Sequence, residues 1–380
     1  MSDALPDHII YDILLLTPVK SLLRFRSLDR RWCETISSRQ FAMDHLKRHE
    51  DRKPSHCVVS YSWSAPAITL HPPDSTGVPR KLDLPISDAD GRDGEFIIRS
   101  SCHGILCTTF GREHATSVFL WNPVTRQCRE VPVPLETPGW ESGQRASNAK
   151  YALGFDPTTD DYKVVRMKST RDTRRPNREI ITLSVKSGGL KKVEDETPYM
   201  PIERAVAVDG YLYWLAKDVE DTYAVLKFDL AEEKLTLVPC PPEAMMKNSR
   251  HEKISLSLHG CGASVRLVRF EHEVEIRWRM KAVWLLGADG GAWSDVSGGY
   301  RAALDRSFPG WGEPLGFTSE AAVINERRRR RGGGSDQIQI GEEEEEEEDG
   351  VEWKRIPRLY GEALHQLLHC ESLVSPCHLT

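Results

Sequence analysis

The chain has 380 residues, of which 39% are hydrophobic and 28% charged, and its formal net charge is −6. This length allows two or three domains with sizeable cores, and the balanced composition excludes collagen-like and wholly disordered classes. No uncharged apolar run reaches the roughly 20 residues that span a bilayer, so no membrane partner is expected. The excess of acidic residues argues against nucleic acid as a general partner.

The amino terminus and the cysteines indicate the compartment. Asp3, Asp7 and Asp12 lie near the start, with no basic residue ahead of an apolar stretch, so neither a secretory signal nor a transit peptide is expected. The nine cysteines are odd in number and dispersed, with no CxxC pair, and are expected to be reduced thiols. Both features predict a protein of the cytoplasm and/or nucleus.

The first 48 residues contain no glycine and place apolar residues at helical spacing. Three helices are expected, of which the first follows Leu5-Pro6 and the third follows Ser27. Between them, Thr17 would cap a second helix and Pro18 would occupy its first position. The apolar stripe of the first helix is too short to form a core alone. Three short helices that pack together and need a partner surface are therefore predicted.

From Cys57 to about Val323, short apolar or alternating runs are separated by Gly, Pro, Asn and Asp, which is typical of many strands joined by turns. This region is predicted to be mostly β. The expected strands are Phe96–Arg99, Gly104–Thr108, Ser117–Trp121, Lys163–Met167, Ile180–Val185, Ala205–Val208, Leu212–Leu215, Ala224–Phe228, Ile254–Leu258, Ser264–Phe270, Val274–Arg277, Lys281–Leu286 and Ala321–Ile324.

A loose internal repeat runs through this region. In each copy a strand ends in an aromatic residue and an Asn or Asp, a polar turn follows, and a valine-containing strand comes next. Val118–Pro132 and Val225–Pro239 align without a gap, Val283–Val296 is a weaker copy, and Phe155–Val165 has the same turn chemistry. The average spacing is near the roughly 40 to 50 residues of a propeller blade, which favours a β-propeller-like domain.

Residues 326–350 hold a run of five arginines, followed by a run of three glycines and later a run of seven glutamates, and are predicted to form a disordered surface loop. The arginine run fits a nuclear import signal, a phosphate-binding patch, or transient pairing with the glutamates across the glycines. Beyond this segment, Trp353–Pro357 resumes the strand pattern, and Tyr360–His369 is predicted to be a short amphipathic helix.

The run Leu5–Ser37 resembles an F-box in order, spacing and residue type. The likeness rests on Leu5-Pro6, on the segment Pro18-Val-Lys-Ser-Leu-Leu-Arg-Phe-Arg26, and on Trp32, with Phe41–His49 as the usual continuation. The sequence departs from the family pattern at Leu15-Leu16-Thr17 and at Leu28-Asp29-Arg30.

The remainder resembles the F-box-associated domain of many plant F-box proteins. The matching motifs, in family order, are Ser100–Cys107, Trp121–Arg126, Tyr151–Val165, Ala205–Leu215, Lys227–Leu230 and Glu371–Pro376. The resemblance implies a mainly β protein with a small α domain. Its parts would be an F-box at residues 1–48, a linker and first strands at 49–94, the F-box-associated β domain at 95–325, the charged loop at 326–350, and the last strand and C-terminal part of the β domain at 351–380.

The same resemblance implies the substrate-recognition subunit of an SCF-type (Skp, cullin, F-box) ubiquitin ligase. The F-box would bind the Skp-family adaptor, and through it the cullin and RING subunits, while the β domain binds a protein target. Proximity would supply catalysis in trans, so no catalytic residue, metal or cofactor is expected. The residues expected to contact the adaptor are Leu5, Pro6, Ile9, Ile13, Pro18, Val19, Leu22 and Phe25, with Arg24 and Arg26 at a polar rim.

Alternatives stay open at this stage. Any one of these ten residues could instead pack the helices together, and the β domain could be a glycan- or ligand-binding regulatory propeller that acts outside a ligase. An enzyme would have to assemble its site from distant residues, since the chain has no GxSxG, HExxH or phosphate-loop motif.

The chain has three Cys/His clusters. His365 and His369, four residues apart on the expected helix, could seat a metal, but packing or surface roles are expected for all three clusters. They are Cys102-His103 with Cys107, His259 with Cys261, and His365 with His369 and Cys370. Trp121, Trp214 and Trp284 are expected in the core.

Overall fold

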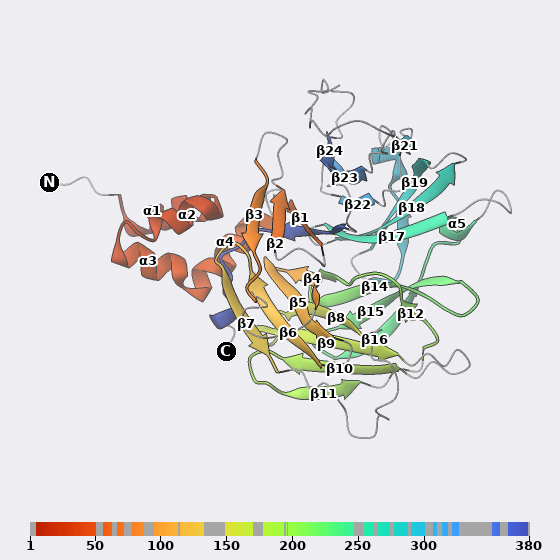
Figure 1. Cartoon of the computed structure of the whole chain (residues 1–380), viewed down its shortest axis with the longest axis horizontal. Helices are drawn as coiled ribbons and strands as arrows, with labels where there is room; N and C mark the ends of the chain where they lie inside the picture. Colours follow the sequence, from red (N-terminus) through yellow and green to blue (C-terminus); the bar gives the residue numbers. More distant parts are fainter. Residues whose placement is uncertain are drawn as a thin grey trace, which may run out of the picture. The chain divides into compact units, whose positions relative to one another are not determined.

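The computed structural model describes most of the chain outside a set of connecting segments (Figure 1). The described residues are 5–50, 56–62, 67–71, 78–86, 95–112, 115–132, 149–169, 178–193, 195, 197–246, 254–261, 264–273, 277–287, 290–300, 307–309, 314–317, 321–326, 352–357 and 364–378. The chain divides into two compact units: unit 1 is Met1–Pro239 with Ala363–Thr380, and unit 2 is Cys240–Glu362.

The amino-terminal part of unit 1 is a helical module of four helices (Figure 1). They are α1 (Asp7–Leu15), α2 (Val19–Phe25), α3 (Arg30–Ser37) and α4 (Arg39–Glu50). The structure thus adds α4 to the three predicted helices and extends the module to Glu50.

The caps of these helices differ from the prediction. Thr17 does not cap α2, because the N-cap residue is Pro18 and the Thr17 hydroxyl donates a hydrogen bond back to the Ile13 carbonyl at 2.9 Å. Helix α3 has the side-chain cap that the sequence analysis missed. The Asp29 carboxylate accepts from the backbone N–H groups of Arg31 and Trp32, and so satisfies two amides that the helix leaves without partners.

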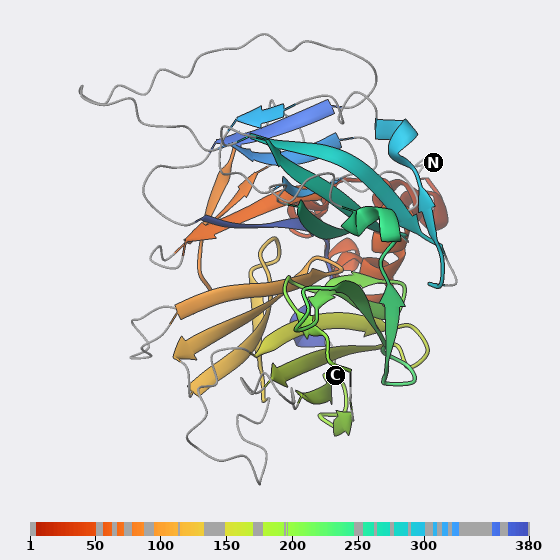
Figure 2. The same cartoon turned by 90° about the vertical axis from the view of Figure 1, so that its right-hand side faces the viewer.

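The strands of unit 1 form four antiparallel sheets, and Figure 2 shows the strands of the second sheet side by side. The first joins β25 (Leu364–Cys370), β1 (His56–Ser62), β2 (Ala67–His71) and β3 (Arg80–Asp83). The second holds β4 (Glu95–Cys102), β5 (Ile105–Arg112), β6 (Ala115–Asn122) and β7 (Gln127–Val131). The third holds β8 (Lys150–Asp156), β9 (Asp161–Ser169), β10 (Arg178–Ser184) and β11 (Leu190–Val193). The fourth holds β12 (Met200–Pro201), β13 (Val206–Val208), β14 (Tyr211–Lys217), β15 (Tyr223–Asp229) and β16 (Lys234–Pro239).

Strand β25 corrects one prediction. Tyr360–His369 was expected to contain a helix, but Leu364–Cys370 is a strand paired along its whole length with β1, from His56 opposite Cys370 to Ser62 opposite Leu364. The backbone partners that β1 offers override the local amphipathic pattern.

Unit 2 holds two further sheets and a short helix, α5 (Pro242–Met245). One sheet joins β17 (Ile254–Cys261), β18 (Ser264–Glu273), β19 (Arg277–Leu286), β20 (Trp293–Asp295) and β21 (Ser307–Pro309). The other joins β22 (Pro314–Phe317), β23 (Ala321–Glu326) and β24 (Glu352–Pro357), the last two in parallel. Residues 327–350 of the charged segment and residues 274–276 of one predicted strand lie outside the described residues.

The internal repeat corresponds to the hairpin between the third and fourth strands of a sheet. Val118–Pro132 covers β6 and β7, Val225–Pro239 covers β15 and β16, and Val283–Val296 covers part of β19 and β20, whereas Phe155–Val165 covers the hairpin between β8 and β9. Three of these turns have the same local structure. An Asn or Asp side-chain oxygen accepts hydrogen bonds from backbone amides, and the residue four positions later has a positive φ. The pairs are Asn122 and Arg126, Asp156 and Asp160, and Asp229 and Glu233.

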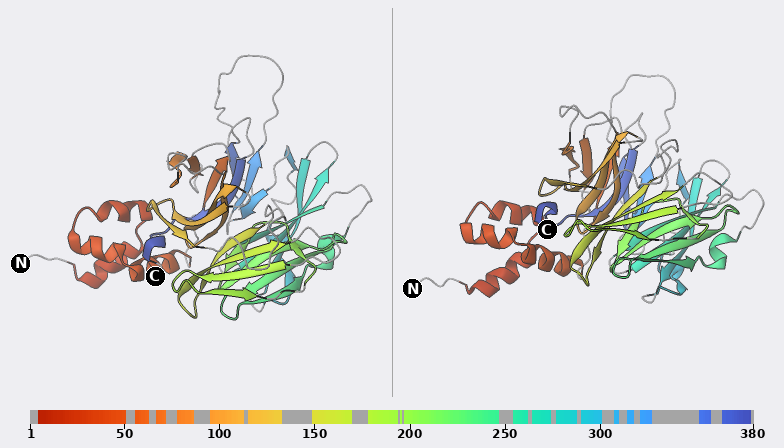
Figure 3. Two further views of the ribbon diagram at one scale, coloured as in Figure 1. Left: turned by 60° about the horizontal axis from the view of Figure 1, so that its bottom comes forward. Right: turned by 90° about the horizontal axis from the view of Figure 1, so that it is seen from below.

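One hydrophobic core runs from the helical module into the β-sheets of unit 1. Leu22 of α2 and Phe41 of α4 belong to the same buried cluster as Ile105 of β5, and so do Leu373 and Val374 near the chain's end. Figure 3 shows the C-terminal turn η3 (Pro376–His378) beside the helices. The helical module is therefore part of the packed structure of unit 1 and does not rely on a linker for its position.

Candidate partner-binding surface of the helical module

The inner face of the helical module is held by α4. The Tyr11 hydroxyl donates to the Asp44 carboxylate at 2.8 Å, and the Tyr11 ring meets Phe41 edge to face at 5.2 Å. The ring nitrogen Nε2 of His45 donates to the Thr17 carbonyl at 2.9 Å. Burial raises the pKa of Tyr11 to about 12, with Asp44 adding to the effect, and burial lowers the pKa of His45. Both side chains therefore stay uncharged at neutral pH and bind α1 and its following turn to α4.

The outer face of α1 carries an exposed apolar stripe. Leu5, Ile9, Ile13 and Leu16 recur every three or four residues, and 55%, 38%, 49% and 43% of their surfaces are exposed, respectively. Ile9 and Ile13 lie within α1, where this spacing places them on one side of the helix, and Leu5 and Leu16 flank its two ends. The opposite side is covered, since Leu14 is only 6% exposed. Helix α1 therefore has apolar side chains on two faces. Among the described residues, unit 1 covers the face that carries Leu14 and leaves the face of Ile9 and Ile13 exposed.

The ten predicted contact residues divide by exposure. Leu5, Pro6, Ile9, Ile13, Pro18, Arg24 and Phe25 are exposed, and Arg26 is half-buried. Val19 and Leu22 are buried, with 7% and 0% of their surfaces exposed, in the cluster that joins the helices to the strands. These two side chains pack the helices together, so the expectation that they meet a partner is corrected. Once α4 covers one side of a helix, residues on that side are buried although their neighbours two or three positions away are exposed.

Two exposed residues were missed by the sequence analysis. Leu16 directly follows α1 and is 43% exposed, and Leu28, which follows α2, is 75% exposed. Both lie at the points where the sequence departs from the family pattern. The three- and four-residue spacing from Leu5 onward was a signal that would have found Leu16.

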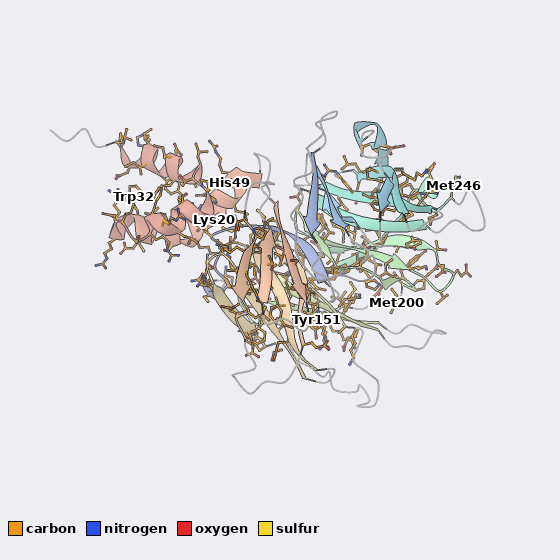
Figure 4. The ribbon with its side chains drawn as sticks, turned by 45° about the horizontal axis from the view of Figure 1, so that its top comes forward. Lys20, Trp32, His49, Tyr151, Met200 and Met246 are labelled. Atoms are coloured by element: carbon orange, nitrogen blue, oxygen red, sulfur yellow. The ribbon has the colours of Figure 1, made fainter. Side chains whose placement is uncertain are left out.

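Charged contacts fix the module on the strands of unit 1. The Arg39 guanidinium pairs with the Asp160 carboxylate and also donates to the Asp160 carbonyl at 3.0 Å. Asp160 is the left-handed residue of the turn between β8 and β9. The hydrogen bond from Arg39 holds the pKa of Asp160 below its usual value. Lys20, labelled in Figure 4, lies 3.8 Å from the Glu371 carboxylate.

The predicted Cys/His clusters lie in packed positions where the structure describes them. Cys102 and Cys107 are buried in the core, and burial raises the pKa of Cys107 to about 12, which keeps it a thiol. His369 is buried and its Nδ1 bonds to the Ser101 hydroxyl at 3.0 Å. The side chains of His259, Cys261 and His365 lie outside the described ones. Within the described part of the chain, no group of three His, Cys, Asp or Glu side chains could hold a metal.

The three tryptophans predicted in the core are buried there. Trp121, Trp214 and Trp284 have at most 5% of their surfaces exposed. Among the described helices, none is long and apolar enough to cross a membrane.

Comparison with known proteins identifies the family. The family model described as "F-box associated beta propeller domain" matches residues 70–286, more than half of the chain. The chain belongs to this family, and the β-propeller class and the plant F-box resemblance of the sequence motifs are confirmed.

Relatives from Arabidopsis thaliana carry names of the same kind. An F-box protein is 24% identical over 312 residues, covering 77% of this chain and 76% of the relative. An F-box/LRR-repeat protein is 25% identical, covering 81% and 69%, and an F-box/kelch-repeat protein is 24% identical, covering 63% and 58%. The last match spans less than two thirds of that relative's length. Among solved structures, TolB from Acinetobacter baumannii matches with a TM-score of 0.38 and 8% identity over 68% of this chain and 59% of TolB, a likeness too low to support an inference.

Proposed function

We propose that this protein is the substrate receptor of an SCF-type ubiquitin ligase, with the outer face of α1 bound to a Skp-family adaptor and the β domain bound to a protein target. The observation that supports it most is the set of exposed side chains of Ile9 and Ile13 on α1 and of Leu5 and Leu16 at its ends, on a helix whose other face is buried. Several exposed apolar side chains close together in the sequence are typical of a protein interface. Membership of the F-box-associated family and the names of the relatives agree with this role.

In this proposal the chain performs no chemistry of its own. The adaptor links it to the cullin and RING subunits, and the receptor raises the local concentration of target lysines near the charged enzyme. The cytoplasm and/or nucleus is the proposed setting. The continuous core between the helices and the strands supports this role, because it fixes the adaptor-facing surface with respect to the β-sheets of unit 1.

Capture by a plant Skp-family adaptor tests the proposal. The full chain is co-expressed with the adaptor and compared with the variant Ile9→Asp with Ile13→Asp, and the dissociation constant is measured by biolayer interferometry. The two changes place charges in the centre of the proposed interface. We therefore expect the affinity of the double variant for the adaptor to fall at least about tenfold. The matched control is Lys47→Asp, an exposed residue on α4, which should bind as the wild type does.

The readout requires that the variants stay folded. Ile9 and Ile13 are exposed, so the double variant should keep the wild-type melting temperature. If the double variant is folded and binds the adaptor with wild-type affinity, the outer face of α1 is not the adaptor-binding surface. A folded chain that binds no Skp-family adaptor would refute the ligase role.

A further inference from the structure

Two cysteines outside the proposed adaptor surface are neighbours in unit 1, although 249 positions separate them in the sequence. Cys128 lies on β7, and Cys377 lies in the C-terminal turn η3, which Figure 1 shows beside β7. The Cys377 thiol donates a hydrogen bond to the Cys128 carbonyl, with 3.8 Å between the sulfur and the oxygen. Both are free thiols in the structure. The fold thus brings together two cysteines that the sequence keeps far apart.

Hydrogen bonds hold the C-terminal segment on the hairpin that carries Cys128. The side-chain amide of Asn122, at the end of β6, donates to the Ser372 carbonyl at 2.9 Å and to the Val374 carbonyl at 2.8 Å. Asn122 pairs with Gln127, the residue before Cys128, so these bonds join the segment to the start of β7. The position of η3 beside β7 is therefore set by the fold before any bond forms between the thiols.

The two thiols differ in their access to solvent. Cys377 is exposed, whereas Cys128 is half-buried against the hydrophobic cluster that contains Trp121. Burial raises the pKa of Cys128 to about 12, and Cys377 adds to the effect. The other cysteines whose side chains the structure describes are buried or half-buried. An oxidant in solution therefore reaches Cys377 first, and Cys128 is the adjacent thiol that can react with the oxidised sulfur.

We propose that Cys377 and Cys128 are a redox modification site, which forms a reversible disulfide when the chain meets hydrogen peroxide. The Cys377 sulfur attacks one peroxide oxygen, the O–O bond breaks, and a sulfenic acid and one water form. The Cys128 sulfur then attacks the sulfenic sulfur, the S–S bond forms, and the hydroxyl group leaves with the Cys128 proton as a second water. The two thiols lose two electrons, which the peroxide gains. A dithiol reductant reverses the modification by thiol–disulfide exchange.

The disulfide would fasten the C-terminal segment to unit 1. Leu373 and Val374 of this segment belong to the core cluster that also contains Leu22 of α2 and Phe41 of α4. A covalent link that closes so long a loop strongly restricts the unfolded chain. We therefore expect the oxidised chain to melt at least about 3 °C above the reduced chain. Oxidation would thus strengthen the core shared by the helical module and the strands, whether or not the chain serves a ligase.

Peroxide treatment of the folded full chain tests the site. The reduced chain is treated with a small excess of hydrogen peroxide, the remaining thiols are alkylated, and digests are examined by mass spectrometry without reductant. We expect a peptide pair joined through Cys128 and Cys377, more than about tenfold above any other cross-link and removed by dithiothreitol. Cys377→Ser should abolish it, and Cys128→Ser should leave Cys377 as a sulfenic acid that dimedone labels. Cys33→Ser, at a half-buried position on α3, is the control and should leave the cross-link unchanged.

The melting temperature separates a lost cross-link from a damaged fold. Cys377 is exposed, so Cys377→Ser should melt with the reduced wild type and should no longer respond to peroxide. The proposal is overturned if Cys377 in the folded wild type stays unreacted, is oxidised without a bond to Cys128, or links two chains. A cross-link without a rise in melting temperature would refute the effect on the core. Adaptor capture plays no part in this experiment, so its failure would bear on the proposed function alone.

Discussion

At the scale of single residues, a buried ion pair ties the third sheet of unit 1 to the fourth. The Lys163 ammonium lies 3.1 Å from the Asp156 carboxylate and 3.1 Å from the Glu233 carboxylate, and donates to the Leu230 carbonyl at 2.5 Å. Burial raises the pKa of Asp156, but hydrogen bonds from Thr158 and its neighbour and from Lys163 outweigh it and hold that pKa well below its usual value. Removing the Asp156 charge would leave Lys163 with Glu233 as its one remaining carboxylate partner and would weaken the hydrogen bonds that the Thr158 and Thr159 hydroxyls donate to Asp156.

We expect Asp156→Asn to lower the free energy of unfolding by about 2 kcal/mol at pH 7, measured by urea denaturation. The Asp156 carboxyl has a lower pKa in the folded state, so its contribution is present above the unfolded pKa of about 4 and is lost as the pH falls below it. The difference between wild type and variant should therefore shrink below about pH 4. The exposed pair of Lys217 and Asp221 supplies the control, since Asp221→Asn should cost less than about 1 kcal/mol. A pH-independent difference would contradict this account.

A single glycine supports the contact between the C-terminal segment and the second sheet. Gly104 has a φ of +76° in the turn between β4 and β5, and a Cβ there would overlap the Ser372 side chain and lie 2.8 Å from the Cys370 carbonyl. The Ser372 hydroxyl donates to the His103 carbonyl at 2.5 Å. Backbone conformation and close approach therefore both require glycine.

Gly104→Ala should lower the free energy of unfolding by about 3 kcal/mol, from left-handed strain and overpacking together. Gly188→Ala is the matched control, because Gly188 has a φ of +70° with nothing within 4 Å of the added Cβ. That variant should lose only about 1 kcal/mol. Equal losses in the two, measured by chemical denaturation, would show that crowding against Ser372 plays no part.

At the scale of elements, the sequence predicted strands well because their hairpin partners are adjacent in the chain. The aligned repeats Val118–Pro132 and Val225–Pro239 both form hairpins between third and fourth strands. Strand β25 was missed because its partner β1 lies some 300 residues earlier, and local pattern carries no sign of it.

Helix α2 illustrates why exposure could not be assigned from the sequence. The spacing of its apolar residues does not say which face α4 and the strands will cover, and Leu22 proved fully buried. We expect Leu22→Asp to lower the melting temperature of the whole chain, because it places an uncompensated charge in the core. Scanning calorimetry should give a fall of more than about 5 °C. Phe25→Asp, at an exposed position on the same helix, is the control and should melt within about 1 °C of wild type.

At the scale of the whole molecule, the helical module and the strands of unit 1 share one core. Removal of residues 1–50 would uncover apolar surface on the strand side of this cluster, including Ile105 and Val118. We therefore expect the shortened chain to melt at least about 5 °C below the full chain and to aggregate more readily, as measured by scanning fluorimetry and light scattering. The full chain with Ile9→Asp and Ile13→Asp should show neither change. A shortened chain with the full chain's melting temperature would show that the module folds independently of the strands.

The pairing of β25 with β1 also has a consequence for how the protein is made. His56 leaves the ribosome more than 300 residues before Cys370, its partner in the ladder. At about 5–20 residues per second, the edge of β1 stays open for roughly 15 to 60 seconds during synthesis. Chaperones that bind open strand edges therefore have time to act on β1. A premature stop before Leu364 would leave that edge permanently open, and quality control would meet a chain with an unpaired strand.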